Sequence, residues 1–222
     1  MEYTIKIFPD PDGEGDYKIR KNKVELTMNY CSNCGHPVHL GVPAGDDRNR
    51  YLCGHCGMIH YQNPKMVVGC IPEWEGKILL CRRSIEPRYG YWTLPAGYLE
   101  NGETVADGAR REAFEEARVR MAAMEPYALF NLAFVNQIYF MFRGPMAGPD
   151  VGAGDESLTV RLFTENDIPW DDLAFTVMRE TLTRYFQDRK RGGFSFHMGD
   201  IVPASKSFSA LDMAGAGTEK GS

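Results

Sequence analysis

Residues 97–119 read GYLENGETVADGARREAFEEARV and carry the strongest pattern in this 222-residue chain. The stretch that follows the Gly-containing segment GYLENG predicts a helix over residues 103–118. Glu112, Glu115 and Glu116 stand at positions i, i+3 and i+4 of that helix. Because a helix turns by about 100° per residue, three such side chains span an arc of roughly 100° and can approach one point.

The helical phase of these carboxylates argues against a purely solvated face. Taking Val105 as zero, Glu112 and Glu116 fall within roughly 20° of it, beside the small residues Ala109 and Ala113. A carboxylate that serves only solvation should point away from that apolar stripe. Like charges at i and i+4 repel by a few tenths of a kcal/mol, a cost that a divalent cation between them offsets. Oxygen ligands of this kind suit Mg²⁺ or Mn²⁺.

The segment resembles the Nudix box, Gly-x5-Glu-x7-Arg-Glu-apolar-x-Glu-Glu-x-Gly-apolar. The resemblance implies a Nudix α/β/α sandwich, a mixed β-sheet between helices, and a metal-dependent hydrolase of pyrophosphate bonds. It implies that Glu112, Glu115 and Glu116 are metal ligands, together with the carbonyl of Gly97. Glu103 and Arg111 would orient the loop and the helix. The residues in register with the pattern are Gly97, Glu103, Arg111, Glu112, Glu115 and Glu116.

Two residues of the segment are unusual for a helix of this kind. Arg118 stands where the family has glycine at the helix end. A non-glycine residue in the left-handed conformation there would cost about 1–2 kcal/mol, unless the helix ends differently. Gly108, inside the helix, costs roughly 1 kcal/mol relative to alanine and indicates close backbone packing at that position.

Four cysteines upstream form two CxxC pairs separated by 18 residues. Each pair can supply two thiolates to one tetrahedral ion, and the gap fits a short hairpin, so we expect a closed, structural zinc ribbon. The alternatives are a redox dithiol or unrelated free thiols. We interpret the neighbouring histidines, His36, His39, His55 and His60, as polar loop residues, and Cys70 and Cys81 as small buried hydrophobes. The predicted zinc ligands are Cys31, Cys34, Cys53 and Cys56.

The pattern along the chain predicts four parts: an N-terminal extension (1–29), the ribbon (30–64), the Nudix domain (65–190) and a C-terminal tail rich in Gly, Ser and Ala (191–222). Within the extension, residues 3–8 are strand-like. Within the Nudix domain we expect a hairpin with its turn at Glu75-Gly76, further strands and a final amphipathic helix. Their expected ranges are 66–74, 77–83, 127–133, 136–143 and 158–164 for strands, and 174–190 for the helix.

The composition of the chain limits the expected binding partners and the expected cellular location. The net charge is −5 and the sequence pI is about 5.6, so no general electrostatic attraction to nucleic acid or anionic membranes is expected. No apolar run approaches the roughly 20 residues that cross a bilayer. The first residues alternate in charge and lack the apolar core of a signal peptide. We therefore expect a cytoplasmic protein, with an organelle as the alternative location.

The resemblance extends to YQNPKMVVGC, WTLPAGYLE, RLF and IPWDDLAF, over roughly residues 30–197. These segments look like the branch that includes plant plastid FAD pyrophosphatases, which implies hydrolysis of FAD to FMN and AMP, or of ADP-ribose. NADH pyrophosphatases also carry a ribbon, but their SQPWPFPxS-type motif is absent. The alternatives are an NADH or nucleoside triphosphate pyrophosphatase, or a non-catalytic module that senses nucleotide. The ribbon is also compatible with a homodimer interface.

Substrate contacts and the catalytic base are predicted less directly. The candidate base that activates water is a box glutamate or Glu156, which stands in the flexible-looking segment GAGDESL before a predicted strand. Thr159 stands where related members often have Glu. The candidates for gripping phosphate or stacking on adenine or flavin rings are Arg82, Tyr91, Trp92, Phe130 and Gln137; packing within strands and loops is the competing interpretation for each.

Overall fold

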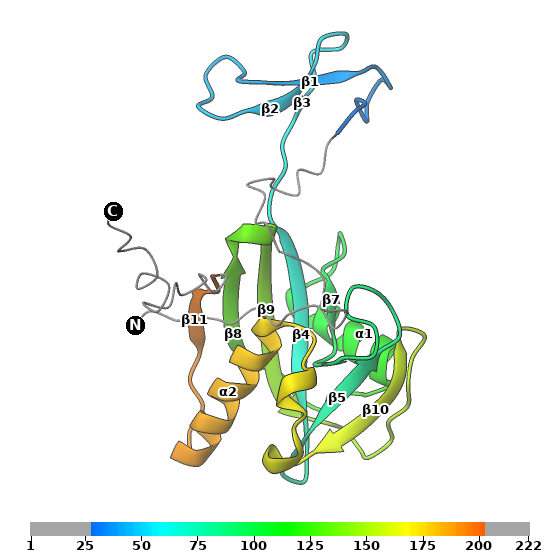
Figure 1. Ribbon diagram of the computed structural model, residues 1–222, viewed down its shortest axis with the longest axis vertical. Helices are drawn as coiled ribbons and strands as arrows, with labels where there is room; N and C mark the ends of the chain where they lie inside the picture. The colour runs from blue at the N-terminus through cyan, green and yellow to red at the C-terminus, as the bar shows by residue number, and fades with distance from the viewer. Residues whose placement is uncertain (1–27, 203–222) are drawn as a thin grey trace, which may run out of the picture.

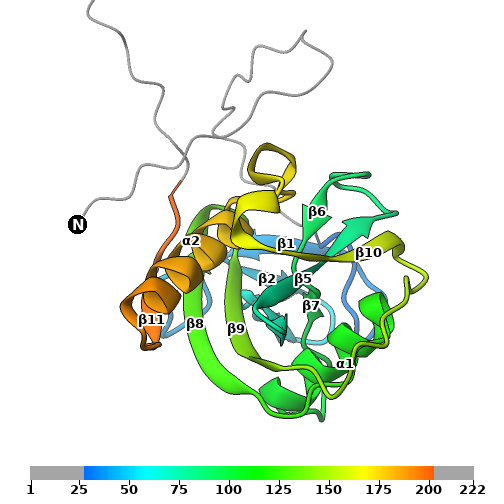
Figure 2. The ribbon, with the colours of Figure 1, turned by 90° about the horizontal axis from the view of Figure 1, so that it is seen from below.

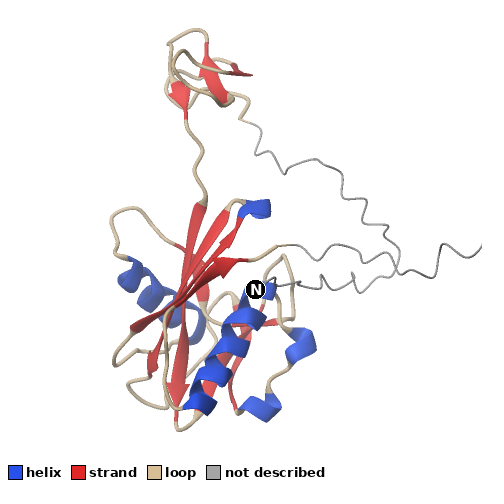
Figure 3. Ribbon diagram, turned by 90° about the vertical axis from the view of Figure 1, so that its left-hand side faces the viewer, coloured by secondary structure: helices blue, strands red, loops and turns tan. Residues whose placement is uncertain are grey.

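The computed structural model describes residues 28–202, which form a small ribbon and a larger α/β unit (Figure 1). The ribbon is an antiparallel three-stranded sheet with the order β1-β2-β3. It stands at one end of the molecule, and a short extended linker joins it to the larger unit (Figures 1 and 3). Its strands are β1 (Val38–Gly41), β2 (Arg50–Cys53) and β3 (Ile59–His60).

The larger unit is built on a mixed sheet with the order β10-β5-β4-β9-β8-β11. The central pair, β4 and β9, is parallel, whereas β4–β5, β5–β10 and β8–β9 are antiparallel. Two short strands extend it, β6 beside β5 and β7 beside β4. The strands are β4 (Lys65–Trp74), β5 (Lys77–Arg83), β6 (Trp92–Thr93), β7 (Ala96–Tyr98), β8 (Glu125–Leu132), β9 (Gln137–Pro145), β10 (Ser157–Phe163) and β11 (His197–Asp200).

Two helices lie on opposite faces of this sheet, α1 (Val105–Ala117) and α2 (Thr176–Arg191) (Figures 2 and 3). Three single-turn 3₁₀ helices complete the connections: η1 (Ala133–Val135), η2 (Glu165–Asp167) and η3 (Trp170–Asp172). The result is a mixed sheet between helices, as the sequence predicts.

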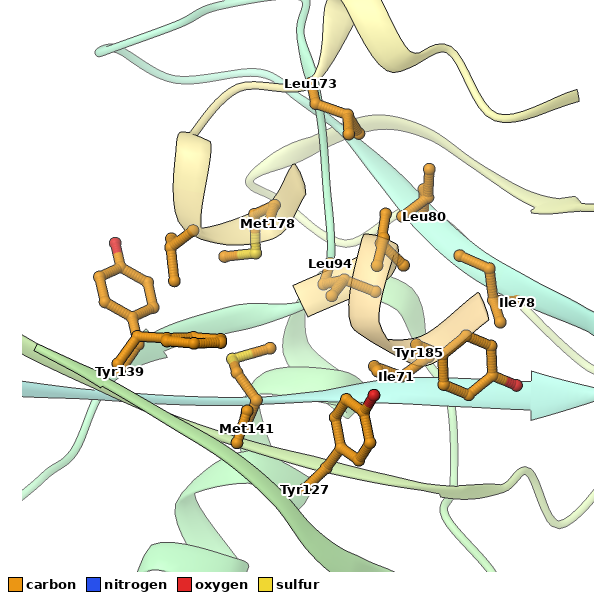
Figure 4. Close-up of a cluster of buried hydrophobic side chains, with 14 of the residues drawn as sticks. Ile71, Ile78, Leu80, Leu94, Tyr127, Tyr139, Met141, Leu173, Met178 and Tyr185 are labelled. Atoms are coloured by element: carbon orange, nitrogen blue, oxygen red, sulfur yellow. The ribbon is translucent and has the colours of Figure 1, made fainter. Parts of the chain in front are cut away.

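Each face of the sheet has its own core because successive residues of a strand point to opposite sides. On the α2 side, Ile71 of β4, Ile78 of β5 and Tyr185 of α2 belong to one buried cluster (Figure 4). On the α1 side, the adjacent residues of the same strands, Cys70 and Leu79, pack with the alanines of α1. Because alanine is small, α1 lies close to the sheet. Glu112 and Glu116 therefore lie against β7.

The elements predicted from the sequence are present with small shifts at their ends. The turn residues Glu75 and Gly76 both have positive φ, 45° and 77°, as a two-residue hairpin turn requires. Strands β6, β7 and β11 were not predicted; β11 lies within the range 191–222 that the sequence marks as a tail. The strand-like run 3–8 lies outside the described residues. Among residues 28–202, neither helix combines the length and apolar character that a membrane span requires.

Candidate active site

The four predicted zinc ligands of the ribbon converge. Their sulfur atoms all lie within 4.8 Å of one another. Each CxxC forms the same turn, in which Gly35 N–H donates to Cys31 O and Gly57 N–H donates to Cys53 O, both at 2.9 Å. Both glycines have positive φ, 73° and 75°, which explains why glycine follows each pair. Four cysteine sulfurs that converge on one point fit a structural zinc site.

Groups around Cys56 favour its thiolate form. The backbone N–H of Met58 and the side-chain amide of Asn33 lower the pKa of Cys56 to about 6. His60 Nε2 lies 3.3 Å from Cys31 Sγ, so this histidine contacts a ligand sulfur and is more than a polar loop residue. Hydrogen bonds to ligand sulfurs orient them around an ion.

Helix α1 presents the box carboxylates. Thr104 caps its N-terminus, with the hydroxyl accepting from Asp107 N–H at 3.1 Å. Glu112 and Glu116 are buried, with 8% and 6% of their surface exposed, while the Glu115 side chain is 56% exposed. The helical phase read from the sequence is therefore confirmed.

Arg111 connects the carboxylates of the box. Its Nε and Nη2 donate to the two oxygens of Glu103 at 3.1 and 2.8 Å. Its Nη1 donates to Glu112 at 2.7 Å and to Glu115 at 3.0 Å, and Nη2 also reaches Tyr98 O. The Arg111 guanidinium, followed by the backbone N–H of Glu100, lowers the pKa of Glu103 to about 2. Glu103 thus holds Arg111 in place, and Arg111 holds the loop before the helix.

Burial disfavours the charged forms of Glu112 and Glu116. Burial, followed by the charge of Glu112, raises the pKa of Glu116 to about 8. Burial also raises the pKa of Glu112. Ala96 N–H donates to Glu116 at 3.2 Å and fixes its orientation. A cation beside these oxygens would favour their charged forms. The Nη1 of Arg111 already acts as such a cation for Glu112, to which it donates at 2.7 Å. Carboxylate oxygens of this kind are the ligands that Mg²⁺ and Mn²⁺ prefer.

Glycine at position 97 is required by contact with Glu112. A Cβ atom there would lie 2.4 Å from Glu112 Cδ, so a larger residue at position 97 would displace this carboxylate. Gly108 is similar one turn earlier in the helix, where a Cβ would lie 2.7 Å from Glu103 Oε1 and 2.9 Å from Val68 Cγ2. The close packing inferred from Gly108 is therefore present.

Residues 152–157, which we call the acidic arm, bring Glu156 to the same place. Gly152 and Gly154 donate their N–H groups to Ala117 O and Glu116 O, at 2.9 and 3.0 Å. The arm thus satisfies carbonyls that the end of α1 leaves without helical partners. On its other side, Ser84 donates through N–H to Glu156 O and through its hydroxyl to Asp155 O. The arm is fastened on both sides, unlike the flexible loop that its composition suggests.

Glu156 lies close enough to influence the helix carboxylates. Its charge is among the causes that raise the pKa of Glu112 and of Glu116. All of these residues line one cavity of about 940 Å³. The cavity is also lined by Gly97, Arg83 and Gln137, so it combines the carboxylates with cationic and amide groups.

The structure places some of the predicted substrate-contact residues in the cavity and others outside its lining. Gln137 lines the cavity, whereas the lining does not include Arg82, Tyr91, Trp92 or Phe130. Phe130 is 1% exposed and belongs to the α2-side core, against which Trp92 also packs. Arg82 donates to Gly90 O; its neighbour Arg83 faces the cavity instead, because adjacent strand residues point to opposite sides.

Arg83 is the functional candidate that sequence reasoning missed. It is 9% exposed, donates through Nε to Pro87 O at 3.0 Å, and packs over the Phe175 ring at 5.1 Å. Its charge stabilises the ionised form of Glu116. The sequence contains both arginines, and only the register of β5 distinguishes them.

Cys70 and Cys81 are confirmed as buried residues, 0% and 1% exposed. They belong to the α1-side core, and burial raises the pKa of both thiols. A thiol kept protonated in this way is neither a nucleophile nor a metal ligand.

Comparisons with known proteins agree with this geometry. Residues 29–62 match the Nudix N-terminal zinc ribbon family, and residues 63–185 match the NUDIX domain family. A structure of a NUDIX hydrolase from Nitrosomonas europaea is 49% identical, with a TM-score of 0.74, and covers 78% of this chain and 100% of its own.

Curated relatives carry the name NAD-capped RNA hydrolase NudC. The protein from Edwardsiella ictaluri is 30% identical over 122 residues, 55% of this chain and 46% of its own length. The protein from Stutzerimonas stutzeri is 31% identical over 163 residues, 70% of this chain and 53% of its own length. The chain thus spans about half the length of these relatives. From the match over residues 63–185 and the box geometry on α1, the chain belongs to the Nudix hydrolase family.

Proposed function

We propose that this chain hydrolyses the pyrophosphate linkage of a nucleoside diphosphate joined to a second moiety. The observation that carries the proposal is the meeting of carboxylates from two separate segments, α1 and the acidic arm, in one cavity that also holds Arg83. Oxygen ligands and a guanidinium together suit a diphosphate, which is anionic and is usually bound through divalent cations.

Glu112, Glu115 and Glu116 would hold Mg²⁺ or Mn²⁺, with the Gly97 carbonyl as a further candidate ligand. When bound, such an ion neutralises phosphate charge and stabilises the leaving phosphate. Arg83 binds a phosphate oxygen from the β5 side. Arg111 and Glu103 keep the loop and helix in place. Water attacks one phosphorus, the bridging P–O bond breaks, and two phosphomonoesters leave.

Glu156 is the proposed base, because its backbone is held on both sides and its side chain is exposed to the cavity. One of its carboxylate oxygens accepts the proton of the attacking water. The buried Glu116, held by Ala96 N–H, serves the ion rather than the water in this arrangement.

The proposed substrates are FAD and ADP-ribose, which share the adenosine diphosphate group. A cavity of about 940 Å³ is large enough for a dinucleotide-sized ligand. A second candidate is a dinucleotide of the NAD type, which the name of the curated relatives favours. All three contain the same bond and would use the same residues.

Product analysis separates these substrates. Purified full-length protein is incubated with Mg²⁺ and, separately, with FAD, ADP-ribose, NADH and nucleoside triphosphates, and the products are resolved by chromatography. FMN and AMP from FAD, with slower turnover of the others, would identify a flavin nucleotide hydrolase. Faster turnover of ADP-ribose or NADH would keep the mechanism and change the substrate. If nothing is hydrolysed with Mg²⁺ or Mn²⁺, the chain is a nucleotide-binding module and the proposal fails.

A further inference from the structure

Four non-glycine residues among those described have positive φ: Glu75, Arg88, Arg118 and Asn136. Glu75 opens a hairpin turn, and Asn136, at the end of η1, is of a type that tolerates this conformation. The two arginines have no such reason, with φ values of 71° and 56°. Both line the cavity.

The backbone conformation at position 118 does not explain why the residue there is an arginine. The residue ends α1, and its N–H donates to Ala113 O and Phe114 O, a cap that glycine forms without strain. The Cβ atom of a larger residue is disfavoured in this conformation. The side chain must therefore account for the choice of residue.

The contacts of the Arg118 side chain are weak. Its Nη2 lies 3.9 Å from Asp155 Oδ1, and the two side chains are 45% and 103% exposed. An ion pair this long and this exposed contributes little. Its guanidinium lies 5.5 Å from the Phe114 ring centre, but Arg120 lies 5.3 Å from the same ring without lining the cavity. Stacking on Phe114 therefore does not explain why Arg118 lines the cavity, because Arg120 stacks on the same ring outside it.

Arg88 lines the same cavity from the loop that follows β5. This loop is tied to the acidic arm by the Ser84 hydroxyl, which donates to Asp155 O at 3.0 Å. Ser84, in the loop that contains Arg88, thus holds the backbone of Asp155. The carboxylate of Asp155 faces Arg118. The Arg88 guanidinium packs over the Tyr91 ring at 5.4 Å.

We propose that Arg118 and Arg88 bind a phosphate group of the substrate at the rim of the cavity. The inference rests on the proposed function and assigns this role to the two strained arginines. Arg111 is not available for it, because its nitrogens are hydrogen-bonded to Glu103, Glu112, Glu115 and Tyr98 O. Two guanidinium groups offer the planar donor pairs that bind phosphate oxygens.

The phosphate has two possible sources, the diphosphate bridge itself or an additional phosphate on the nucleotide. NADH and NADPH differ only in such an additional phosphate. If Arg118→Gly weakens binding of both equally, the arginine binds the bridge. If it weakens binding of NADPH alone, the arginine binds the additional group.

The decisive experiment compares Arg118→Gly with Arg120→Ala. The first variant removes the strain together with the charge; the second removes an equal charge on the same Phe114 ring outside the cavity. The KM values of the preferred substrate, NADH and NADPH are measured, with the dissociation constant of ADP from calorimetry without added Mg²⁺ as a readout independent of turnover. Thermal melting reports the fold.

We expect Arg118→Gly to raise KM and the ADP dissociation constant about tenfold, as the loss of a charge-assisted hydrogen bond predicts. Its melting temperature should match or exceed that of the parent protein, since strain is relieved, so weaker binding cannot reflect unfolding. Arg88→Gly should behave in the same way. Arg120→Ala should leave both constants within twofold. Equal effects of Arg118→Gly and Arg120→Ala, or no effect of either, would overturn the inference. An inactive parent protein that still binds ADP through Arg118 would overturn the proposed function alone.

Discussion

At the residue scale, two glycines of the site have no room for a side chain, one beside a carboxylate and one beside the backbone of α1. Gly97 lies against Glu112, and Gly154 lies against the last turn of α1. A Cβ at Gly154 would lie 1.6 Å from Glu115 O, an overlap that backbone atoms cannot tolerate. The sequence segment GAGDESL suggests flexibility, whereas its second glycine is needed for a tight contact.

Gly154→Ala is predicted to reduce turnover by at least tenfold, because the acidic arm must move away from α1 and carry Glu156 with it. Steady-state kinetics and thermal melting check this. Gly148→Ala is the matched control, since a Cβ there meets nothing within 4 Å. Parent-like turnover of Gly154→Ala would show that the position of the arm does not matter to the reaction.

Glu115→Gln and Glu116→Gln are each predicted to lower turnover severely, by about 100-fold or more, while the fold persists. Neutral Gln keeps the shape of the side chain but removes the charge that binds a cation. Glu75→Gln, in the hairpin turn, is the control. Kinetics over a range of Mg²⁺ concentrations provide the test, and normal activity in both variants would refute the metal-site assignment.

Glu156→Gln is predicted to lower kcat by about 100-fold with little change in KM, since the side chain is assigned to proton transfer rather than binding. A large rise in KM with kcat intact would instead make Glu156 a binding residue, and a box glutamate would become the base.

The residues of α1 were predictable because helical phase is a property of sequence alone: Glu112 and Glu116 fall on the apolar side and are buried. Arg83 was not, because choosing it over Arg82 requires the register of β5. The contact between the acidic arm and α1 was also hidden, since hydrogen bonds from a loop to helix carbonyls leave no periodic signal.

At the element scale, β11 shows how a short strand is held without an apolar pattern. It pairs in parallel with β8, and buried Asp188 of α2 anchors it. Asp188 accepts hydrogen bonds from Tyr127 at 3.2 Å and from the His197 ring at 2.6 Å. Strands of two to four residues, such as β6, β7 and β11, are too short for alternation to be visible, whereas the long strands and both helices were predicted.

Asp188 should make stability depend on pH. Burial alone would raise its pKa, but the hydrogen bonds from His197, Ser195 N–H and Tyr127 outweigh burial and lower it. Because the folded value is lower than the unfolded one, the stabilisation is present above the ordinary value of about 3.8 and is lost as pH falls through the lower value.

Asp188→Asn is therefore predicted to lose about 2 kcal/mol of unfolding free energy at neutral pH and to show a flatter decline below pH 4 than the parent protein. Denaturant unfolding at a series of pH values measures both. Asp150→Asn, on an exposed loop, is the control. An identical decline in parent and Asp188→Asn would mean that other carboxylates govern acid stability.

At the scale of the whole molecule, the ribbon and the α/β unit are stabilised differently. The α/β unit has two apolar cores, one on each face of its sheet. In the ribbon, Cys31 and Cys53 are the buried hydrophobic residues, and the four cysteines gather at one point. Small modules of this kind obtain their folding free energy from the metal.

Removal of zinc is predicted to unfold the ribbon and leave turnover within about twofold of the untreated protein, since the residues assigned to catalysis lie outside it. The protein is treated with a chelator, dialysed and supplied with Mg²⁺; metal analysis, proteolysis of residues 28–64 and kinetics are compared, and zinc is then restored. Loss of turnover in step with loss of zinc would show that the ribbon completes the catalytic site.

We expect Arg111 to give the two proposed metal sites different relations to folding. Its guanidinium joins Glu103, Glu112 and Glu115, so the acidic helix carries an internal counter-charge and is not held together by an external ion. An incoming cation competes with that counter-charge, which lowers its affinity below what the number of carboxylates suggests. We therefore expect the α/β unit to exchange a bound ion with the surrounding pool without losing its shape, whereas a ribbon that folds on its ion would have to keep it.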